Sequence, residues 1–513
     1  MKERVLFVIL PYYTNLYAGH EEKDRLCPTL PYGVLSVIRH IKEYAEVKIF
    51  DCCLHENYVE LLDDVLKDFN PSIAGFNMMY DSSFLHLNSL VNQARAFKKD
   101  IKILLGGAAT PYVFSEVLDR VPELDAVCFR DGERPMLDLF NTGTYNNAWA
   151  TRTNKFPVKS ILTNLDDVVD IDFSYIEIKD YQDDLILENF SPFVYPEQAT
   201  QLYMMGSRGC NCSCTFCTNS KNPDKKIRHA SIGAIVKHIE YLVGEYGINV
   251  LSLYDEQVLA NKKWAKELFR SLGKFNLTVK LPSGVSTLYI DQEMADLMWG
   301  AGVDAVGLAV ESGSKRVLKL MDKPVSLNQV RRSMTYLRKH NFFIRAFLVM
   351  GIPGETDEDR QMSVDFLSEI RPDVISPNIA SPILGSRLRD ECIEKGYIRT
   401  AELGMYDRME PFITTEDFTA EYIKAQSLRA NWKINFVNNY RMAVGDYETA
   451  RRYFEYVAQR YPFEAFAWYF LNKANEKLGL PQDWSNFNRC LNEQPLWIGR
   501  LKEFGIDVGE IHE

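Results

Sequence analysis

The feature that most constrains the fold of this 513-residue chain is a regular alternation of short β-rich runs with helical patterns, beginning at residue 4. Runs such as RVLFVIL, EVKIFD, PSIAGFNMM and IKILLGG are each followed by a segment whose apolar residues recur with helical spacing. Strands separated by helices at this spacing predict a parallel sheet with helices on both faces. Residues 1–140 are therefore expected to form a doubly wound, Rossmann-like α/β domain, in which ligands bind beyond the carboxyl ends of the strands.

A second α/β series follows residues 141–200, a polar stretch without periodicity that is interpreted as a linker. Six strand-and-helix units between residues 201 and 390 are too few for a closed eight-unit barrel, so a partial barrel is expected. Residues 391–513 are mainly helical, and the segment from Asp446 to Gly479 resembles one tetratricopeptide unit. Because one unit makes no solenoid, a helical cap on the preceding domain is favoured over a partner-docking role.

The composition excludes several classes of partner. With 46% hydrophobic and 25% charged residues, the chain has the composition of a folded globular protein. A formal charge of −11 supplies no basic surface for a nucleic-acid backbone, so a small-molecule or peptide substrate is expected. No stretch approaches the roughly 18 apolar residues of a membrane-spanning helix, and the opening residues show no signal-peptide cleavage site. The expected location is cytoplasmic.

Four of the ten cysteines stand between residues 210 and 217, and in a cytosolic chain such clustering indicates metal binding before disulfides. Cys210, Cys214 and Cys217 have C-x3-C-x2-C spacing. Three thiolates on a short loop can bind three irons of a four-iron, four-sulfur cubane and leave the fourth iron open to a non-protein ligand. A zinc site would normally need four protein ligands. Cys212 is a poor fourth ligand, because it stands two residues from both Cys210 and Cys214 and cannot easily converge on the same metal.

With Phe216 at its aromatic position, the cysteine loop resembles that of the radical S-adenosylmethionine (SAM) superfamily, where C-x3-C-x-aromatic-C follows the first barrel strand. The resemblance continues along the second α/β series through the motifs YDE, LPSG, VESGS and MGIPGE. It implies that SAM chelates the open iron, that an electron from the reduced cluster cleaves its sulfonium, and that strand ends line SAM. The residues so implicated are Phe216, Glu256, Ser283, Glu311, Ser312, Gly351 and Ile352.

Some of these assignments have alternatives. Many relatives carry an arginine near the sequence STLYID, where this chain has Ser286 and Thr287, so contacts to the ribose or carboxylate of SAM would come from elsewhere, such as Ser283 or Arg345. Glu256 and Glu311 could equally be strand-end carboxylates held in salt bridges, and for Arg345 a structural role is favoured over a contact with SAM.

Residues 28–51, with LLGGAATPY at 104–112 and CFRDGERPMLDLF at 128–140, resemble the cobalamin-binding domain of one radical SAM subclass. Two adjacent glycines in LLGGAATPY would let the backbone approach a large planar ligand such as a corrin. The residues implicated in cobalamin binding are Asn77, Ser82, Gly106, Gly107 and Thr110. Residues 1–140 contain no Asp-x-His-x-x-Gly motif, so relatives that share the fold without cobalamin are the alternative.

Together the two resemblances imply cobalamin-dependent methylation of an unactivated carbon in a small molecule or peptide, with a reducing donor such as flavodoxin or ferredoxin. The protein would position the cofactors and exclude water, so no catalytic acid or base is assigned. The same architecture can catalyse radical cyclisation, rearrangement or oxidation without methyl transfer. A non-catalytic iron–sulfur or cobalamin carrier is the alternative of another class.

Overall fold

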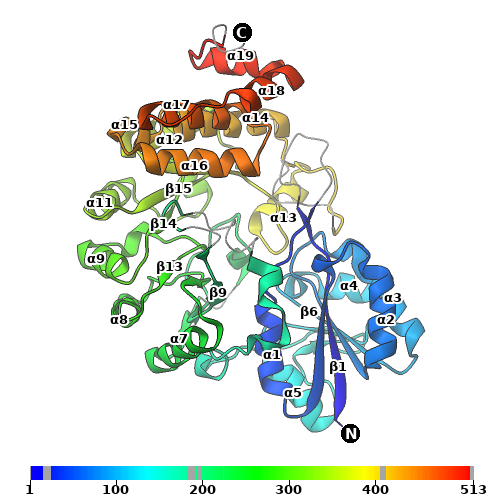
Figure 1. Cartoon of the computed structure of the whole chain (residues 1–513). Helices are drawn as coiled ribbons and strands as arrows, with labels where there is room; N and C mark the ends of the chain where they lie inside the picture. Colours follow the sequence, from blue (N-terminus) through cyan, green and yellow to red (C-terminus); the bar gives the residue numbers. More distant parts are fainter. Residues whose placement is uncertain are drawn as a thin grey trace. The chain divides into compact units, whose positions relative to one another are not determined.

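The computed structural model describes residues 2–14, 25–182, 191–194, 198–222, 225–404 and 412–508, and the chain divides into two compact units (Figure 1). Unit 1 comprises Met1–Asn189, Ala199–Val258 and Ser381–Thr414. Unit 2 comprises Phe190–Gln198, Leu259–Ala380 and Thr415–Glu513. The N-terminal sheet and the cysteine loop therefore belong to the same unit.

Unit 1 contains a six-stranded sheet in the order β4-β1-β5-β6-β7-β8. Its strands are β1 (Glu3–Ile9), β4 (Ala45–Asp51), β5 (Ile73–Asn77), β6 (Lys102–Gly106), β7 (Ala126–Cys128) and β8 (Trp149–Ala150). Neighbouring strands from β4 to β7 pair in parallel, and β8 joins β7 in the antiparallel direction. This topology confirms the predicted doubly wound class and brings the carboxyl ends of the parallel strands to one edge.

Helices cover both faces of this sheet. Helix α1 (Tyr32–Ile41) packs with α5 (Glu133–Thr142), and α2 (Tyr58–Phe69) packs with α3 (Phe84–Phe97) on the other side, next to α4 (Phe114–Arg120) (Figure 1). In α2 the buried residues include Leu62, Leu66 and Phe69, whose spacing of three and four residues gives the helix one apolar face. That face joins a core formed with the sheet residues Leu6, Val8, Phe76 and Ile103.

The second α/β series begins in unit 1. The parallel strands β9 (Gln201–Met204) and β12 (Val250–Leu253) are connected through the short antiparallel pair β10 (Ser207–Arg208) and β11 (Arg228–His229) and helix α7 (Ile232–Tyr246). The Ser231 hydroxyl accepts a hydrogen bond from the Ala234 amide at the start of α7, and Gly247 ends the helix in the left-handed conformation. Helix α13 (Arg387–Glu394) also belongs to unit 1.

Unit 2 continues the series with β13 (Thr278–Lys280) and a parallel sheet of β14 (Ala305–Glu311), β15 (Phe343–Met350) and β16 (Val374–Ile379). The helices that alternate with these strands are α8 (Lys262–Leu272), α9 (Gln292–Gly300), α10 (Lys315–Leu320), α11 (Leu327–Leu337) and α12 (Asp357–Ile370). The alternation confirms the α/β class predicted for residues 201–390.

The C-terminal part of unit 2 is helical, as predicted. Its elements are α14 (Ala420–Asn431), the π-helix Trp432–Val437, α15 (Tyr440–Val444), α16 (Tyr447–Arg460), α17 (Ala465–Leu478), α18 (Ser485–Glu493) and α19 (Leu496–Glu503). The Trp432 ring stacks on Phe466 with ring centroids 5.2 Å apart. Both rings belong to a core that also contains Phe343 of β15 and Val374 of β16, so these helices pack on the strands of their own unit.

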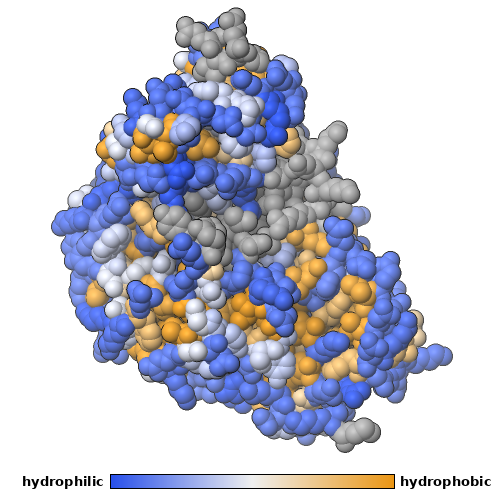
Figure 2. Space-filling view, viewed as in Figure 1, coloured by the Kyte–Doolittle hydropathy of each residue, from blue (hydrophilic) through white to orange (hydrophobic). Residues whose placement is uncertain are grey.

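Among the described residues, no helix is long and apolar enough to cross a membrane. The outer margins in Figure 2, where α2, α3, α8, α9 and α11 lie in Figure 1, are mainly hydrophilic. This is the surface expected of amphipathic helices that bury one face against a sheet.

Candidate functional site

The three cysteines predicted as metal ligands lie on the loop between β10 and the 3₁₀ turn Thr218–Lys221. Cys210 and Cys217 are half-buried, and Cys214 is buried. The Cys217 amide donates a hydrogen bond to the Cys214 carbonyl oxygen at 3.0 Å, which closes the second half of the loop into a turn. Phe216 is half-buried within that turn. The structure thus brings the three cysteines and Phe216 together on one loop.

Two side chains that the sequence did not single out hold the backbone of this loop. The buried Asn219 amide group donates to the carbonyl oxygens of Cys210, at 2.9 Å, and Cys212, at 3.0 Å. The Lys225 ammonium group donates to the Cys212 carbonyl at 3.0 Å and to the Asn219 carbonyl at 2.7 Å. All four of these hydrogen bonds are accepted by backbone carbonyl oxygens of the loop and none by a cysteine sulfur. The sequence signal for them is slight, because an asparagine and a lysine are common in any polar loop.

The surroundings of the thiols differ from one cysteine to the next. Burial raises the pKa of the Cys217 thiol. Hydrogen bonds with the sulfurs of Cys210 and Cys214 raise the pKa of Cys212. The Cys212 thiol therefore lies directly beside two of the predicted ligands.

In the part of the chain that the structure describes, no group of three or more His, Cys, Asp or Glu side chains is arranged to hold a single metal ion. A cubane binds each thiolate through a different iron, so its ligands surround the cluster and do not converge on one point. A tetrahedral zinc site needs four ligands that do converge. The donor set of three cysteines on one loop fits a four-iron cluster with one open iron.

The start of the loop depends on Gly209, whose φ is +108°. A Cβ at this position would lie 2.6 Å from the Lys226 carbonyl oxygen, so only glycine fits. The Gly209 amide donates to the carboxylate of Glu256 at 2.6 Å. Glu256, predicted to contact SAM, is exposed and holds the backbone beside the first cysteine.

The neighbouring Asp255 is buried at the end of β12. Its carboxylate accepts hydrogen bonds from the Ser207 hydroxyl at 2.5 Å and from the Gly206 amide at 3.2 Å. Burial raises the pKa of Asp255 to about 6, although these hydrogen bonds favour the ionised form. The two acidic residues after β12 therefore fix both ends of β10.

Helix α13 also supports the cysteine loop. The Leu388 amide donates to the Thr215 carbonyl at 2.9 Å, and the Arg387 amide donates to the Ser220 hydroxyl at 3.0 Å. The Arg387 guanidinium also donates to the Ser213 carbonyl oxygen. A segment nearly 170 residues further along the chain thus fixes the loop conformation.

At the carboxyl edge of the N-terminal sheet, three of the residues predicted to bind cobalamin shape a turn. Gly107 has a φ of +119°, and a Cβ there would lie 2.3 Å from the Met78 carbonyl oxygen. The buried Thr110 hydroxyl lies within hydrogen-bond distance of the carbonyl oxygens of Gly107, at 2.9 Å, and Cys128, at 3.1 Å. Asn77 is buried at the end of β5. The glycine at 107 is thus required by the approach of the protein's own backbone.

The other two residues predicted to bind cobalamin, Gly106 and Ser82, are not engaged in this turn. No atom of the described residues lies within 4 Å of the Cβ position of Gly106. Among the described residues, the buried hydroxyl oxygens of Ser82 and Ser83 have no hydrogen-bond partner. Buried polar atoms are normally satisfied, so these two hydroxyls leave hydrogen-bonding capacity for a polar ligand. The corrin of cobalamin carries amide groups around its rim, and this edge fits such a group.

Aromatic and charged side chains border the same edge. Tyr12, beyond β1, stacks on Tyr80, beyond β5, with ring centroids 3.9 Å apart. Asp81 accepts a hydrogen bond from the Gly404 amide at 2.8 Å and lies 3.7 Å from the Arg389 guanidinium. Residues 381–404 therefore pack against the loop that follows β5.

Direct contacts connect this edge with the cysteine loop. The Tyr112 hydroxyl donates to the carbonyl oxygen of Thr218, one residue after Cys217, at 3.2 Å. The Arg208 guanidinium donates to the buried Glu133 carboxylate at 2.9 Å. Although burial opposes ionisation, Arg208 lowers the pKa of Glu133. The cysteine loop and the cobalamin-type sheet are thus joined within unit 1.

In unit 2 the residues predicted to contact SAM lie at the ends of β14 and β15. Glu311 is buried, has a φ of +65° and pairs with the Lys323 ammonium group at 2.7 Å. The Ser312 hydroxyl lies 2.9 Å from that of Ser363 and accepts a hydrogen bond from the Ser314 amide at 3.0 Å. These side chains are engaged within the protein, so they order the strand end.

The segment after β15 is held in a similar way. The Gly351 amide donates to the buried carboxylate of Glu355 at 2.6 Å, and the next residue, Ile352, is buried. Burial raises the pKa of Glu355 to about 7. Ser283, beyond β13, is exposed.

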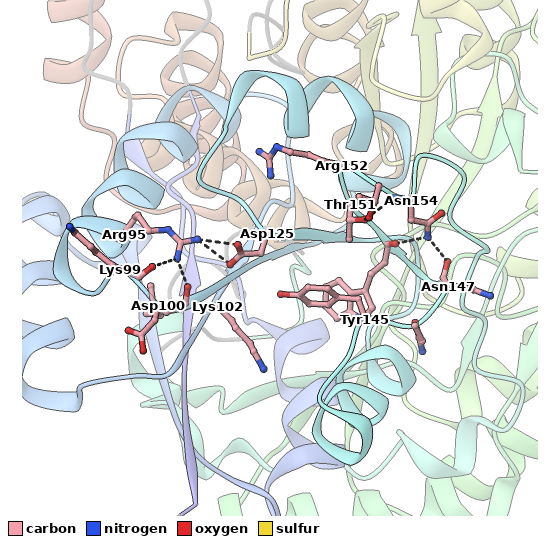
Figure 3. A pocket seen from close by; sticks show the side chains of 14 residues that line it. Arg95, Lys99, Asp100, Lys102, Asp125, Tyr145, Asn147, Thr151, Arg152 and Asn154 are labelled. Atoms are coloured by element: carbon pink, nitrogen blue, oxygen red, sulfur yellow. Dashed lines mark hydrogen bonds and ion pairs between the residues drawn. The ribbon is translucent and has the colours of Figure 1, made fainter.

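A pocket of about 710 Å³ lies elsewhere in unit 1 (Figure 3). Its lining includes Lys102 at the start of β6, Asp125 before β7, and Tyr145. These residues mark the amino ends of the strands, whereas ligands of doubly wound sheets bind at the carboxyl ends. None of the residues predicted for a cofactor lines this pocket.

The fold and the cysteine loop define an iron–sulfur enzyme with a cobalamin-type domain. The family model of the radical SAM superfamily matches residues 204–367, and that of the B12 binding domain matches residues 28–140. The chain belongs to the radical SAM superfamily and carries a B12-binding domain. The two matched families use the predicted cofactors, a four-iron, four-sulfur cluster with SAM and cobalamin. Like other radical SAM enzymes, it requires a reductant and a substrate.

Known proteins resemble the chain over most of its length. The cytidylyl-2-hydroxyethylphosphonate methyltransferase of Streptomyces wedmorensis is 28% identical over 73% of this chain and 80% of its own length. The radical SAM methyltransferase TsrM of Kitasatospora setae, solved with cobalamin and a [4Fe-4S] cluster, has a TM-score of 0.61 at 14% identity, covering 78% of this chain and 76% of its own. The cobalamin-dependent SAM radical enzyme OxsB, solved with aqua-cobalamin and SAM, has a TM-score of 0.64 at 14% identity, covering 98% and 80%.

Proposed function

We propose that the chain is a cobalamin-dependent radical SAM methylase that methylates an unactivated carbon of a small molecule or peptide. The observation that carries this proposal is the union of the cysteine loop and the cobalamin-type sheet in one compact unit. The contacts of Tyr112 with Thr218 and of Arg208 with Glu133 hold the loop and the carboxyl edge of the sheet together. Two cofactors held in one compact unit can act on the same substrate atom without a large domain movement.

Each part of the site has a role in this proposal. Cys210, Cys214 and Cys217 would each bind one iron, and Asn219 and Lys225 would keep their loop in the ligating conformation. The carboxyl edge around Gly106 and Ser82 would receive cobalamin. When bound, the reduced cluster supplies the electron that cleaves SAM, and cobalamin carries the methyl group.

The residues of unit 2 that are proposed to contact SAM include strand ends whose conformation is fixed by contacts within the protein. The pairs of Glu311 with Lys323 and of Gly351 with Glu355 fix the backbone after β14 and β15. Because this backbone is already ordered, binding of SAM costs little further conformational entropy, which favours tight and oriented binding. Ser283, the exposed member of the set, is proposed to hydrogen-bond SAM directly.

The relatives favour methyl transfer. The Streptomyces wedmorensis relative is a methyltransferase, and an uncharacterized methyltransferase of Pyrococcus horikoshii is 22% identical over 77% of this chain and 85% of its own length. A second candidate is radical cyclisation or oxidation without methyl transfer. It is favoured by the anaerobic magnesium-protoporphyrin IX monomethyl ester cyclase of Cereibacter sphaeroides, which is 22% identical over 74% of this chain and 62% of its own length.

The proposed reductant is a small electron-transfer protein such as flavodoxin or ferredoxin. A cytoplasmic location is also proposed, because ten cysteines without a disulfide among the described ones fit a reducing compartment.

The test is anaerobic reconstitution of the full chain with iron, sulfide and hydroxocobalamin, followed by reduction in the presence of SAM and candidate substrates. Absorption bands of a corrin and a four-iron cluster should survive gel filtration. Methylation predicts a methylated product formed together with S-adenosylhomocysteine and 5′-deoxyadenosine. Formation of 5′-deoxyadenosine with an unmethylated product would favour the second candidate, and no consumption of SAM would contradict both. Protein treated with an iron chelator before the assay is the control.

A further inference from the structure

Arg130 stands in an unusual backbone conformation at the carboxyl edge of the unit 1 sheet. It follows β7 by two residues and has a φ of +86°, in the left-handed region that residues with a side chain rarely adopt. The backbone on both sides is fixed by Ser160, whose amide donates to the Phe129 carbonyl and whose carbonyl accepts from the Asp131 amide, each at 3.2 Å. Strain of this kind persists where the surrounding structure imposes it, and it concentrates at functional sites.

Two carboxylates that closely follow Arg130 in the sequence pair with other arginines. Asp131 pairs with Arg228 at 2.8 Å, and Glu133 pairs with Arg208 at 2.9 Å. Each of these two carboxylates therefore pairs with an arginine other than Arg130. Within the described ranges Arg130 has no ion pair, and its buried Nε has no hydrogen-bond partner. Its guanidinium lies over the face of the Tyr112 ring, 5.4 Å from the ring centroid.

The position of Arg130 relates it to both parts of the cofactor site in unit 1. Tyr112, which lies against the guanidinium, also donates its hydroxyl hydrogen to Thr218 of the cysteine loop. Thr110, at the start of the same turn, reaches the carbonyl of Cys128, two residues before Arg130. A half-buried guanidinium that has no carboxylate partner among the described residues therefore lies where the cobalamin-type edge meets the cysteine loop.

We propose that Arg130 binds an oxyanion, either a carboxylate or a phosphate group, of a molecule held at this edge. This inference rests on the proposed function, because it takes the edge to be the place where cofactors and substrate meet. A guanidinium offers a planar fork of donors that matches both oxyanions in a bidentate geometry. Three sources carry such a group: the phosphodiester of cobalamin, the carboxylate of SAM, and an anionic substituent of the substrate.

Three variants separate charge from backbone strain. Arg130→Gln removes the charge and keeps the strained backbone, Arg130→Lys keeps the charge without the fork, and Arg130→Gly removes both charge and strain. If the arginine serves a ligand, the melting temperature of Arg130→Gly equals or exceeds that of the wild type, because glycine adopts this φ readily. A clear fall in the melting temperature of Arg130→Gly, with ligand binding unchanged, would show a purely structural role and overturn the proposal.

The ligand measurements identify the source of the oxyanion. Affinities are measured for hydroxocobalamin, for cobinamide, which lacks the phosphodiester, and for SAM on the cluster-reconstituted protein. Loss of a charge-assisted hydrogen bond predicts a drop of about tenfold or more for the Gln and Gly variants, and a smaller drop for Lys. A drop for cobalamin but not cobinamide assigns the phosphodiester, and a drop for SAM alone assigns its carboxylate. If neither affinity drops, the melting temperature is measured with and without inorganic phosphate. Protection by phosphate of the wild type but not of Arg130→Gln then assigns the oxyanion to the substrate.

Equal affinities in all variants together with no difference in phosphate protection would overturn the role of Arg130 and leave the proposed function intact. A wild-type chain that binds neither cobalamin nor SAM would instead contradict the proposed function. The two failures are therefore distinguishable.

Discussion

The guanidinium of Arg208 lies 2.9 Å from the carboxylate of Glu133, and the two side chains are 16% and 4% exposed. The Ser36 hydroxyl completes the group by donating to the same carboxylate at 2.6 Å. Arg208 stands two residues before Cys210, and Glu133 begins α5 of the cobalamin-type sheet. One buried ion pair thus connects the strand that leads into the cysteine loop with the domain proposed to hold cobalamin.

Substitution of Glu133 by alanine should destabilise the protein and weaken cluster retention. It leaves Arg208 buried, and among the described residues its remaining carboxylate partner is Asp131, at 3.9 Å. Breaking a buried pair by removing one partner costs about 3–5 kcal/mol. Urea unfolding and the iron content per chain after reconstitution measure the two effects. Glu116→Ala is the matched control, because Glu116 pairs with Arg120 on an exposed helix face where such a pair contributes about 0.5 kcal/mol. Equal losses in the two variants would contradict the role given to the buried pair.

Among the four clustered cysteines, alanine substitution should separate Cys212 from the rest. Cys210→Ala, Cys214→Ala and Cys217→Ala each remove one iron ligand, and we expect them to lose most of the iron and sulfide. Cys212→Ala should retain both, since this thiol lies beside the ligands without being one of them. Iron and sulfide analysis and electron paramagnetic resonance of the reduced protein check this. If Cys212→Ala lost the cluster while one of the other three variants kept it, the ligands would not be Cys210, Cys214 and Cys217.

Gly209→Ala should disturb the loop although it adds only one methyl group. The new Cβ would lie 2.6 Å from the Lys226 carbonyl oxygen, and the φ of +108° would be strained. Either effect moves the backbone directly before Cys210, so we expect reduced iron incorporation. Gly233→Ala is the control, because no atom lies within 4 Å of that Cβ position and alanine in α7 should stabilise the helix by up to about 1 kcal/mol. Comparable iron content in the two variants would argue against a conformational role for Gly209.

The sequence predicted the fold class and the cofactors because both depend on local patterns. The alternation of strands and helices follows from hydrophobic periodicity, and the C-x3-C-x2-C spacing lies within eight residues. The order of the strands, β4-β1-β5-β6-β7-β8, was not predicted, because the alternation constrains the hand of each crossover connection but not which strands become neighbours.

The contacts that complete the candidate site were beyond the reach of these patterns. Tyr112 and Thr218 are 106 residues apart, and Arg208 and Glu133 are 75 residues apart. Such pairs form only when separate elements pack, and no periodicity in either segment encodes the partner. The same holds for Glu256, whose carboxylate binds the Gly209 amide across 47 residues. For a strand-end carboxylate, the sequence left a ligand contact and an internal contact equally open.

A pH effect should arise from Glu355, whose carboxylate accepts the Gly351 hydrogen bond after β15. Burial raises the pKa of Glu355 from 4.5 to about 7. In the unfolded chain this group loses its proton near pH 4.5, so between about pH 4.5 and pH 7 the folded protein binds more protons than the unfolded one. Stability must therefore fall as the pH rises through this window. Asp255, whose pKa burial raises to about 6, contributes a fall of the same sign.

Glu355→Gln isolates the contribution of Glu355, because glutamine cannot ionise and still offers an oxygen to the Gly351 amide. Arg360, the cation beside Glu355, keeps its contact with Asp357 at 2.7 Å, so the substitution does not leave it unpaired. The variant should match the wild type near pH 4.5 and become the more stable protein above pH 7, by up to about 3 kcal/mol. Urea unfolding at intervals from pH 5 to pH 8 measures the difference between the two proteins, in which the contribution of Asp255 cancels. Parallel profiles over this range would mean that Glu355 is already ionised in the folded protein, with Arg360 offsetting the cost of its burial.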